Sequence, residues 1–162
     1  MRKAIIKITR NMSDETYAEF VRTVEIYNEW FKDLVKYGDV YHNMDRYDGI
    51  NWDGIQYYDD LTKKGAVVAF KPDPDGTVDD TYCVPFKGLD DKATYYVWRE
   101  NNKIPFATYT GEQLRKGINL TLEGSYKAEV IYFMETTAID AEEVIRIPSQ
   151  VSALVVENLG AI

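Results

Sequence analysis

Three pairs of adjacent aspartates are the first residues in this sequence that could do chemistry: Asp59-Asp60, Asp79-Asp80 and Asp90-Asp91. Acid–base cleavage of a glycosidic bond needs two carboxyl groups that face each other across the bond. Each pair lies in a segment rich in turn-forming residues, and neighbours in a turn rarely converge on one bond. We therefore interpret the pairs as solvated turn residues and predict no catalytic residue in the chain.

The segment DPDGTVDD, from Asp73 to Asp80, is the candidate for a metal site. Calcium takes about six to eight oxygen ligands, and these carboxylates have the spacing of a loose calcium loop. However, Pro74 breaks the EF-hand pattern and no glutamate closes the loop. A plain hairpin loop is the favoured interpretation, so we predict no metal and no other cofactor. The alternative is a calcium site formed by Asp73, Asp75, Asp79 and Asp80.

Zinc and nucleophilic chemistry have no support in the sequence. His42 is the only histidine and Cys83 the only cysteine, which leaves a zinc ion without enough ligands. Cys83 cannot form an internal disulfide, and its strand-like surroundings, TYCVPF, predict a buried and inert thiol. The chain contains no G-x-S-x-G nucleophile motif, no P-loop and no dinucleotide fingerprint.

Aromatic side chains are abundant, at 14% of the residues, and 13 of them are tyrosines. Flat rings can stack on sugars, but they also fill cores and cover contacts with neighbouring domains. Strand alternation puts Tyr57 and Tyr58 on opposite faces, and likewise Tyr95 and Tyr96, so half of these rings are expected in a core. The candidates for sugar binding are Trp52, Tyr58 and Trp98.

One long amphipathic helix is predicted between Ser13 and Gly38, about 24 residues in length. Ser13 is a suitable N-cap, and the negative charge of Asp14 is favourable in the first turn because of the helix dipole. Gly38 is expected to end the helix as a C′ residue. Trp30 widens the apolar face, which is broad enough to pack on more than one partner. The apolar stripe consists of Tyr17, Phe20, Val21, Val24, Tyr27, Phe31, Leu34 and Val35.

After Gly38 the helical period gives way to short strands separated by turn residues. The fold class is therefore mainly β: an antiparallel Greek-key β-sandwich of about eight strands, preceded by the long helix. We divide the chain into an N-terminal arm and helix (residues 1–38) and the sandwich (residues 39–162). A helical turn is expected at 110–114. The predicted strands lie near 39–43, 54–59, 65–71, 81–87, 94–100, 117–123, 126–135 and 151–158.

Charge and hydropathy exclude several classes of partner. The net charge of −8 argues against nucleic acid and against an anionic membrane surface. No apolar run approaches the ~20 residues of a membrane span, and the N-terminal segment lacks the features of a signal peptide. We predict a soluble protein of unknown compartment, cytoplasmic or secreted if a signal lies upstream.

A family resemblance is carried by several segments in order. Gly38-Asp39 and Tyr41 are followed by Trp52, then by Gln56-Tyr57 at the end of one strand and Phe70-Lys71 at the end of the next. The segments FKGLDDKATYYVW, YTGEQLRKGINLTL and IPSQVSALVVEN follow. Together they resemble the C-terminal β-sandwich of α-galactosidases, the melibiase-type glycoside hydrolases similar to family 36.

The resemblance implies a sandwich attached to a (β/α)₈ barrel whose strands carry the catalytic aspartates. No segment here matches those strands, so no catalytic residue is carried over, and residues 1–38 would be the tail of a missing barrel. We expect a non-catalytic accessory domain of a glycoside hydrolase, with the barrel as its partner. Two alternatives remain: a stand-alone module that binds neutral oligosaccharides, and an assembly domain that self-associates through the helix face.

Overall fold

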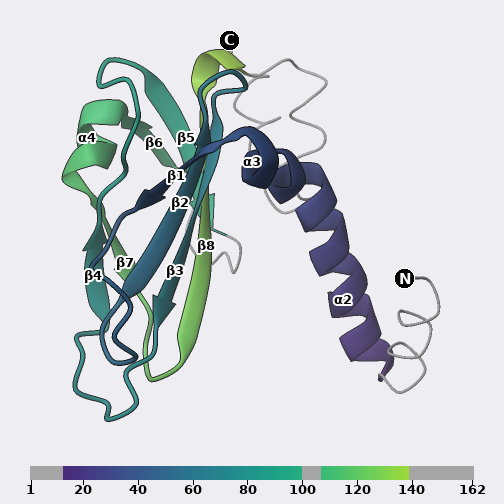
Figure 1. Ribbon diagram of the computed structural model, residues 1–162, viewed down its shortest axis with the longest axis vertical. Helices are drawn as coiled ribbons and strands as arrows, with labels where there is room; N and C mark the ends of the chain where they lie inside the picture. Colours follow the sequence, from purple (N-terminus) through teal and green to yellow (C-terminus); the bar gives the residue numbers. More distant parts are fainter. Residues whose placement is uncertain (1–12, 100–106, 139–162) are drawn as a thin grey trace. The chain divides into compact units, whose positions relative to one another are not determined.

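The computed structural model describes residues 13–99 and 107–138 (Figure 1). The chain divides into two compact units, with the boundary between Asp33 and Leu34, and each unit is described by itself. The predicted N-terminal arm and the strand predicted at 151–158 lie outside the described residues. Among the described helices, none combines the length and the apolar character that a membrane crossing requires.

The predicted long helix is confirmed and spans 24 residues. It comprises α2 (Asp14–Ile26), a π-helical turn η1 (Tyr27–Phe31) that was not predicted, and α3 (Lys32–Tyr37). Ser13 is the N-cap, and its Oγ accepts a hydrogen bond of 3.2 Å from the Thr16 amide. None of the residues of α2 and η1 is buried.

Gly38 follows the helix as predicted, but not in the left-handed conformation of a C′ glycine, since its φ is not positive. A glycine is required at this position because there is no room for a Cβ. A Cβ at this position would lie 2.7 Å from the carbonyl oxygen of Leu34 and 3.2 Å from that of Tyr58. The chain therefore passes directly from the last helical turn along the backbone of a strand.

Within the described residues after the helix, eight strands form two antiparallel sheets, and neither sheet closes on itself. This confirms the mainly β prediction. The six-stranded sheet has the order β1-β2-β3-β8-β5-β6, and β4 pairs with β7 in a two-stranded sheet (Figure 1). The short β6 was not predicted. The bounds are β1 Asp39–His42, β2 Asp53–Asp59, β3 Lys64–Lys71, β4 Thr81–Val84, β5 Thr94–Arg99, β6 Ala107–Thr110, β7 Ile118–Thr121 and β8 Lys127–Glu135, with α4 Gly111–Lys116 and a 3₁₀ turn η2 Thr136–Ala138.

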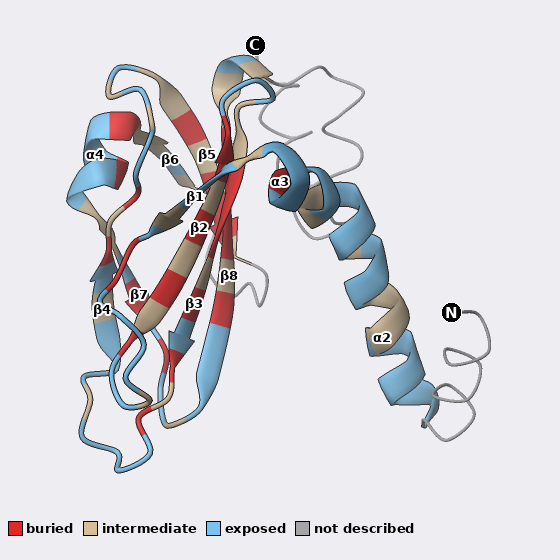
Figure 2. Cartoon of the chain, viewed as in Figure 1, coloured by how far each residue is buried: buried red, intermediate tan, exposed pale blue. Residues whose placement is uncertain are grey.

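The main core lies on the side of the six-stranded sheet that carries Phe133, and residues of β4 and β7 contribute to it (Figure 2). The Phe133 ring centroid lies 5.7 Å from that of Tyr58, 5.1 Å from that of Phe86 and 6.4 Å from that of Tyr95. Such aromatic pairs add about 0.5–1.5 kcal/mol to the effect of burial. The core also contains Val67, Ala69, Val84, Val97, Leu120 and Ile131.

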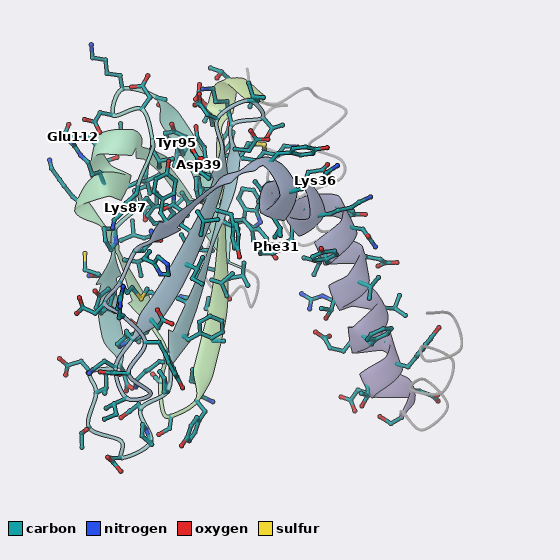
Figure 3. The ribbon with its side chains drawn as sticks, viewed as in Figure 1. Phe31, Lys36, Asp39, Lys87, Tyr95 and Glu112 are labelled. Atoms are coloured by element: carbon teal, nitrogen blue, oxygen red, sulfur yellow. The ribbon has the colours of Figure 1, made fainter. Side chains whose placement is uncertain are left out.

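A buried polar network fixes the chain segment after β4 against β1 and β2. The Asn43 Nδ2 donates to Gln56 Oε1 at 2.8 Å and to the carbonyl oxygen of Pro85 at 2.6 Å. Gln56 in turn donates through Nε2 to the Lys87 carbonyl at 2.6 Å and accepts from the Lys87 amide at 2.9 Å. Lys87, labelled in Figure 3, also donates through Nζ to the His42 carbonyl at 2.6 Å. The network satisfies backbone groups where no strand pairs with this segment.

The prediction of a buried Cys83 is wrong, because its side chain is exposed. Alternation along β4 is the reason: Val84 is buried in the core and Tyr82 packs against it, so Cys83 between them faces outward. The helical turn predicted at 110–114 is confirmed as α4. Thr110 and Gln113 form its capping box.

Candidate interaction site on the outer face of the six-stranded sheet

The six-stranded sheet has a second apolar face, opposite the face that carries Phe133, which we call the outer face. Strand register places Tyr57, Ala66, Tyr132 and Trp98 in one row across four strands. The rings of Trp98 and Tyr132 stack, with centroids 5.6 Å apart and planes inclined by 19°. By register and alternation, the other outer-face residues include Val40, Ile55, Val68, Phe70, Tyr96, Ala128, Val130 and Met134.

Exposure differs along the outer face. Trp98, Tyr132 and Met134 are buried, whereas Val68 and Val130 are only partly buried. Farther along the same strands, Phe70 is 40% exposed, and at the sheet edge Val40 in β1 is 54% exposed. The end of the outer face near Phe70 therefore offers apolar surface to a partner.

The sheet is apolar on both faces, and this distinguishes it from a sheet with one solvated side. An antiparallel sheet that faces water alternates apolar and polar residues. In β8, however, Ile131 and Phe133 on one face alternate with Val130 and Tyr132 on the other. Contiguous apolar surface of this kind marks a site of contact with another part of a protein. The outer face is therefore the candidate functional site.

The three residues predicted to bind sugar are covered. Trp52 is 4% exposed, Tyr58 2% and Trp98 3%. Trp52 Nε1 donates to the carbonyl oxygen of Asp79 at 2.9 Å, and Trp98 stacks on Tyr132 of the outer face. Tyr58 belongs to the main core, where burial and the neighbouring Tyr95 raise its pKa. Sugar binding by these residues stays a prediction, and it would require their rings to be uncovered.

The four candidate calcium ligands do not form one cluster, because only Asp73 and Asp80 meet at a common atom. Asp73 is buried and Asp80 is exposed, and both carboxylates pair with the ammonium of Lys71. Asp75 and Asp79 are exposed. Among the described residues, no group of three or more acidic, histidine or cysteine side chains could hold a metal ion. The calcium alternative therefore has no preformed ligand cluster among the described residues.

Sequence reasoning missed Lys71, although a signal was present. Val67 and Ala69 point into the core, and Lys71 continues the same alternation. The pattern therefore predicts that the Lys71 side chain points inward. A buried lysine needs paired carboxylates. Asp73 and Asp80, two of the four residues of the alternative calcium site, supply these carboxylates.

A small pocket between β5, β6, β7 and β8 is another place where a ligand could be sought. Val97, Arg99, Tyr109 and Ile118 are among the residues that line it. The Arg99 guanidinium donates to Glu129 Oε2 from Nε at 3.1 Å and from Nη2 at 2.9 Å. Because its cation is already paired, Arg99 contributes to the fold here and offers little to an anionic substrate.

The apolar stripe of the helix is a second candidate interaction surface, in the unit that ends at Asp33. Tyr17, Val24 and Tyr27 are 48%, 41% and 49% exposed. A helix needs its apolar face covered to be stable, because isolated helices are marginal in water. The self-association predicted through this face remains a prediction.

Comparison with known proteins places the fold. No protein-family model matches the sequence, and no curated protein sequence matches it. Among solved structures, the GH36 alpha-galactosidase AgaA from Geobacillus stearothermophilus is similar with a TM-score of 0.66 and 17% identity. AgaB from the same organism has a TM-score of 0.64 with 16% identity, and the alpha-galactosidase from Lactobacillus brevis has 0.61 with 20%.

The matched region is most of this chain but a small part of each similar enzyme. It covers 78% of this chain but only 17% of each of these three chains. The sequence resemblance to α-galactosidases is thereby confirmed at the level of fold: the chain has the fold of one part of these larger enzymes.

Proposed function

We propose that the chain is a non-catalytic accessory β domain of an α-galactosidase-like glycoside hydrolase, C-terminal to a catalytic barrel that it supports. The observation that carries the proposal is the one-sided match, which covers 78% of this chain and 17% of the enzyme AgaA. A domain that occurs within larger hydrolases, and whose own carboxylates lie in turns and ion pairs, is suited to a supporting role.

The outer face is the surface by which the domain would contact the barrel. The sheet already has one core on its opposite face, so the outer face does not serve that core. Phe70 is exposed, and Val68 and Val130 are partly buried between it and the row of covered rings. Val40 is exposed at the sheet edge, in the same row as those rings. Stable contacts between domains of one chain have such an apolar centre.

The test is recovery of the native protein from its source with an antibody raised against the chain. We expect a catalytic barrel segment to be recovered with it, as part of the same polypeptide or as a bound chain. Mass spectrometry identifies that segment, and hydrolysis of an aryl α-galactoside by the recovered material reports its activity. The chain purified by itself should show no hydrolysis.

The outer face is tested in the same material with Phe70→Lys. A charge in a desolvated apolar contact is strongly unfavourable, so the variant should lower the thermal midpoint of the hydrolase activity. Leu61→Lys is the matched control, because Leu61 is 93% exposed and lies in the turn between β2 and β3. Recovery of the chain with no hydrolase segment would refute the proposal, and equal effects of the two variants would refute the assigned surface.

A further inference from the structure

A single buried ammonium joins three oxygen atoms from different parts of the chain. Lys71 lies at the end of β3, and its side chain is 0% exposed. Its Nζ lies 3.2 Å from Asp73 Oδ2 and 3.3 Å from the Leu122 carbonyl oxygen, and it also donates to Asp80 Oδ1. One carboxylate is buried with it, since the Asp73 side chain is 3% exposed, whereas that of Asp80 is 50% exposed.

Asp73 links the Lys71 ammonium to the backbone of the loop that follows β3. Its Oδ1 accepts hydrogen bonds from the amides of Thr77 at 2.7 Å and Val78 at 3.0 Å. Its backbone has φ 46°, a left-handed conformation that costs energy for a residue with a Cβ. The carboxylate that faces Lys71 is therefore also the group that shapes residues 73–78.

Asp80 connects the same ammonium to the turn between β7 and β8. Its carbonyl oxygen accepts from the Leu122 amide at 2.8 Å, and its Oδ1 accepts from the Gly124 amide at 3.3 Å. The turn is tied to the loop a second time, because the Tyr126 amide donates to the Pro72 carbonyl at 2.8 Å.

A third segment, before β2, is attached to this loop. The amide of Asp73 donates to the carbonyl of Ile50 at 3.0 Å, and Trp52 Nε1 donates to the carbonyl of Asp79 at 2.9 Å. Three loops, at residues 48–52, 72–80 and 122–126, are thus bonded to one another around the residues that Lys71 holds.

We propose that Lys71 is an internal cation that locks these three loops into one cooperative unit, so that they open and close together. Removal of the ammonium leaves the buried Asp73 carboxylate without a cation, and an unpaired buried charge is far more costly than a lost surface pair. Asp73 must then reach solvent, and the amides that depend on it and on Asp80 lose their acceptors together.

Hydrogen exchange of individual amides, followed by NMR in the full chain, tests the proposal with Lys71→Met. The reporters are the amides of Asp73, Thr77, Val78, Leu122, Gly124 and Tyr126. We expect all six to exchange about tenfold faster or more, by a similar factor, while amides of β3 and β8 in the main sheet change little. Lys63→Met is the matched control, because Lys63 pairs with Asp60 across an exposed turn at 2.6 Å.

Asp80→Asn keeps the test decisive if the lysine variant fails to fold, because Asp80 is half exposed. The proposal predicts faster exchange at Thr77 and Val78, whose amides Asp80 does not touch. Faster exchange confined to Leu122 and Gly124, the direct partners of Asp80, would overturn it. So would a Lys71→Met variant in which the six amides change independently.

Discussion

At the scale of single residues, Gly65 and Phe133 show how closely this core is packed. They are direct partners in the β3–β8 ladder, and the Phe133 ring lies over Gly65. A Cβ on Gly65 would lie 2.1 Å from Phe133 Cζ, so the ring would have to move. We expect Gly65→Ala to lower the free energy of unfolding by about 1–3 kcal/mol, the usual cost of overpacking, as measured by urea denaturation.

A second substitution separates this clash from other effects of the alanine. Phe133→Leu removes the ring atoms in question and has its own cost, but in that background Gly65→Ala should cost much less. The double-mutant cycle therefore gives a favourable coupling between the two changes. Strict additivity would show that the ring is not what requires a glycine.

The Lys71 ion pairs predict how stability depends on pH. Hydrogen bonds from the Val78 amide, and the nearby Lys71, hold the pKa of Asp73 below its ordinary 3.8, and Lys71 does the same for Asp80. A lowered carboxyl pKa stabilises the fold above pH 3.8, and this contribution is lost as the pH falls through the folded value. We expect urea midpoints to fall below about pH 4, and less steeply in Asp80→Asn. Equal slopes would contradict the assignment.

The same ion pairs set the alkaline limit with the opposite sign. The hydrogen bond to Asp80 raises the pKa of Lys71 above 10.5, so its contribution is complete below pH 10.5 and is lost as the pH rises through the folded value. Urea midpoints of the wild type should decrease as the pH rises above 10.5. The midpoints of Lys71→Met should lack the part of this decrease that comes from deprotonation of Lys71.

Single residues also show the limit of sequence reasoning. Alternation correctly separated Tyr57 from Tyr58, but the period alone does not say which face of a strand meets the main core. Tyr58 was selected for the surface and belongs to the core, and Cys83 was assigned to the interior and is exposed. Only the strand order, which depends on contacts far apart in sequence, decides the face.

At the scale of elements, the amide of Gln56 holds the segment after β4. We expect Gln56→Leu to lower the free energy of unfolding by about 1–3 kcal/mol, because it leaves the Lys87 amide and carbonyl without their partner and removes one of the two hydrogen bonds of Asn43. Asn119→Leu is the control, on the exposed face of β7. Equal denaturation midpoints for the two variants would show that the network is not required.

The capping box of α4 gives a smaller, local prediction. Thr110 accepts from the Gln113 amide at 3.2 Å, and Gln113 accepts from the Thr110 amide at 2.8 Å. We expect Thr110→Ala to cost about 0.5–2 kcal/mol in the free energy of unfolding. Thr108→Ala, on an exposed position of β6, should have little effect. A similar loss in both variants would point to strand propensity as the cause.

Elements with strong local signals were predicted, and those without them were not. The helix was found from its cap and apolar period, and β2, β3 and β8 from their alternation. The short β6, Ala107–Thr110, has no long apolar run, and it pairs with the edge of β5. The π-helical turn at Tyr27–Phe31 was not predicted, because the apolar residues of the helix continue through it at three- and four-residue spacing.

At the scale of the whole molecule, the exposed part of the outer face predicts the behaviour of the chain by itself. Phe70 and Val40 should favour self-association when no other partner is present. We expect the weight-average mass in sedimentation equilibrium to rise with concentration for the wild type, and to rise less for Phe70→Lys, whereas Leu61→Lys should resemble the wild type. A wild type that stays monomeric throughout would contradict this use of the surface.

The position of β8 between β3 and β5 has a consequence for synthesis. β8 is the last described strand in the chain, yet it joins the β1–β3 meander to the β5–β6 hairpin. Until it leaves the ribosome, the nascent chain has two half-sheets with open edges at β3 and β5, and such edges invite pairing with other chains. Translational pauses or truncations before Lys127 should therefore cause aggregation, whereas the completed chain closes both edges with one strand.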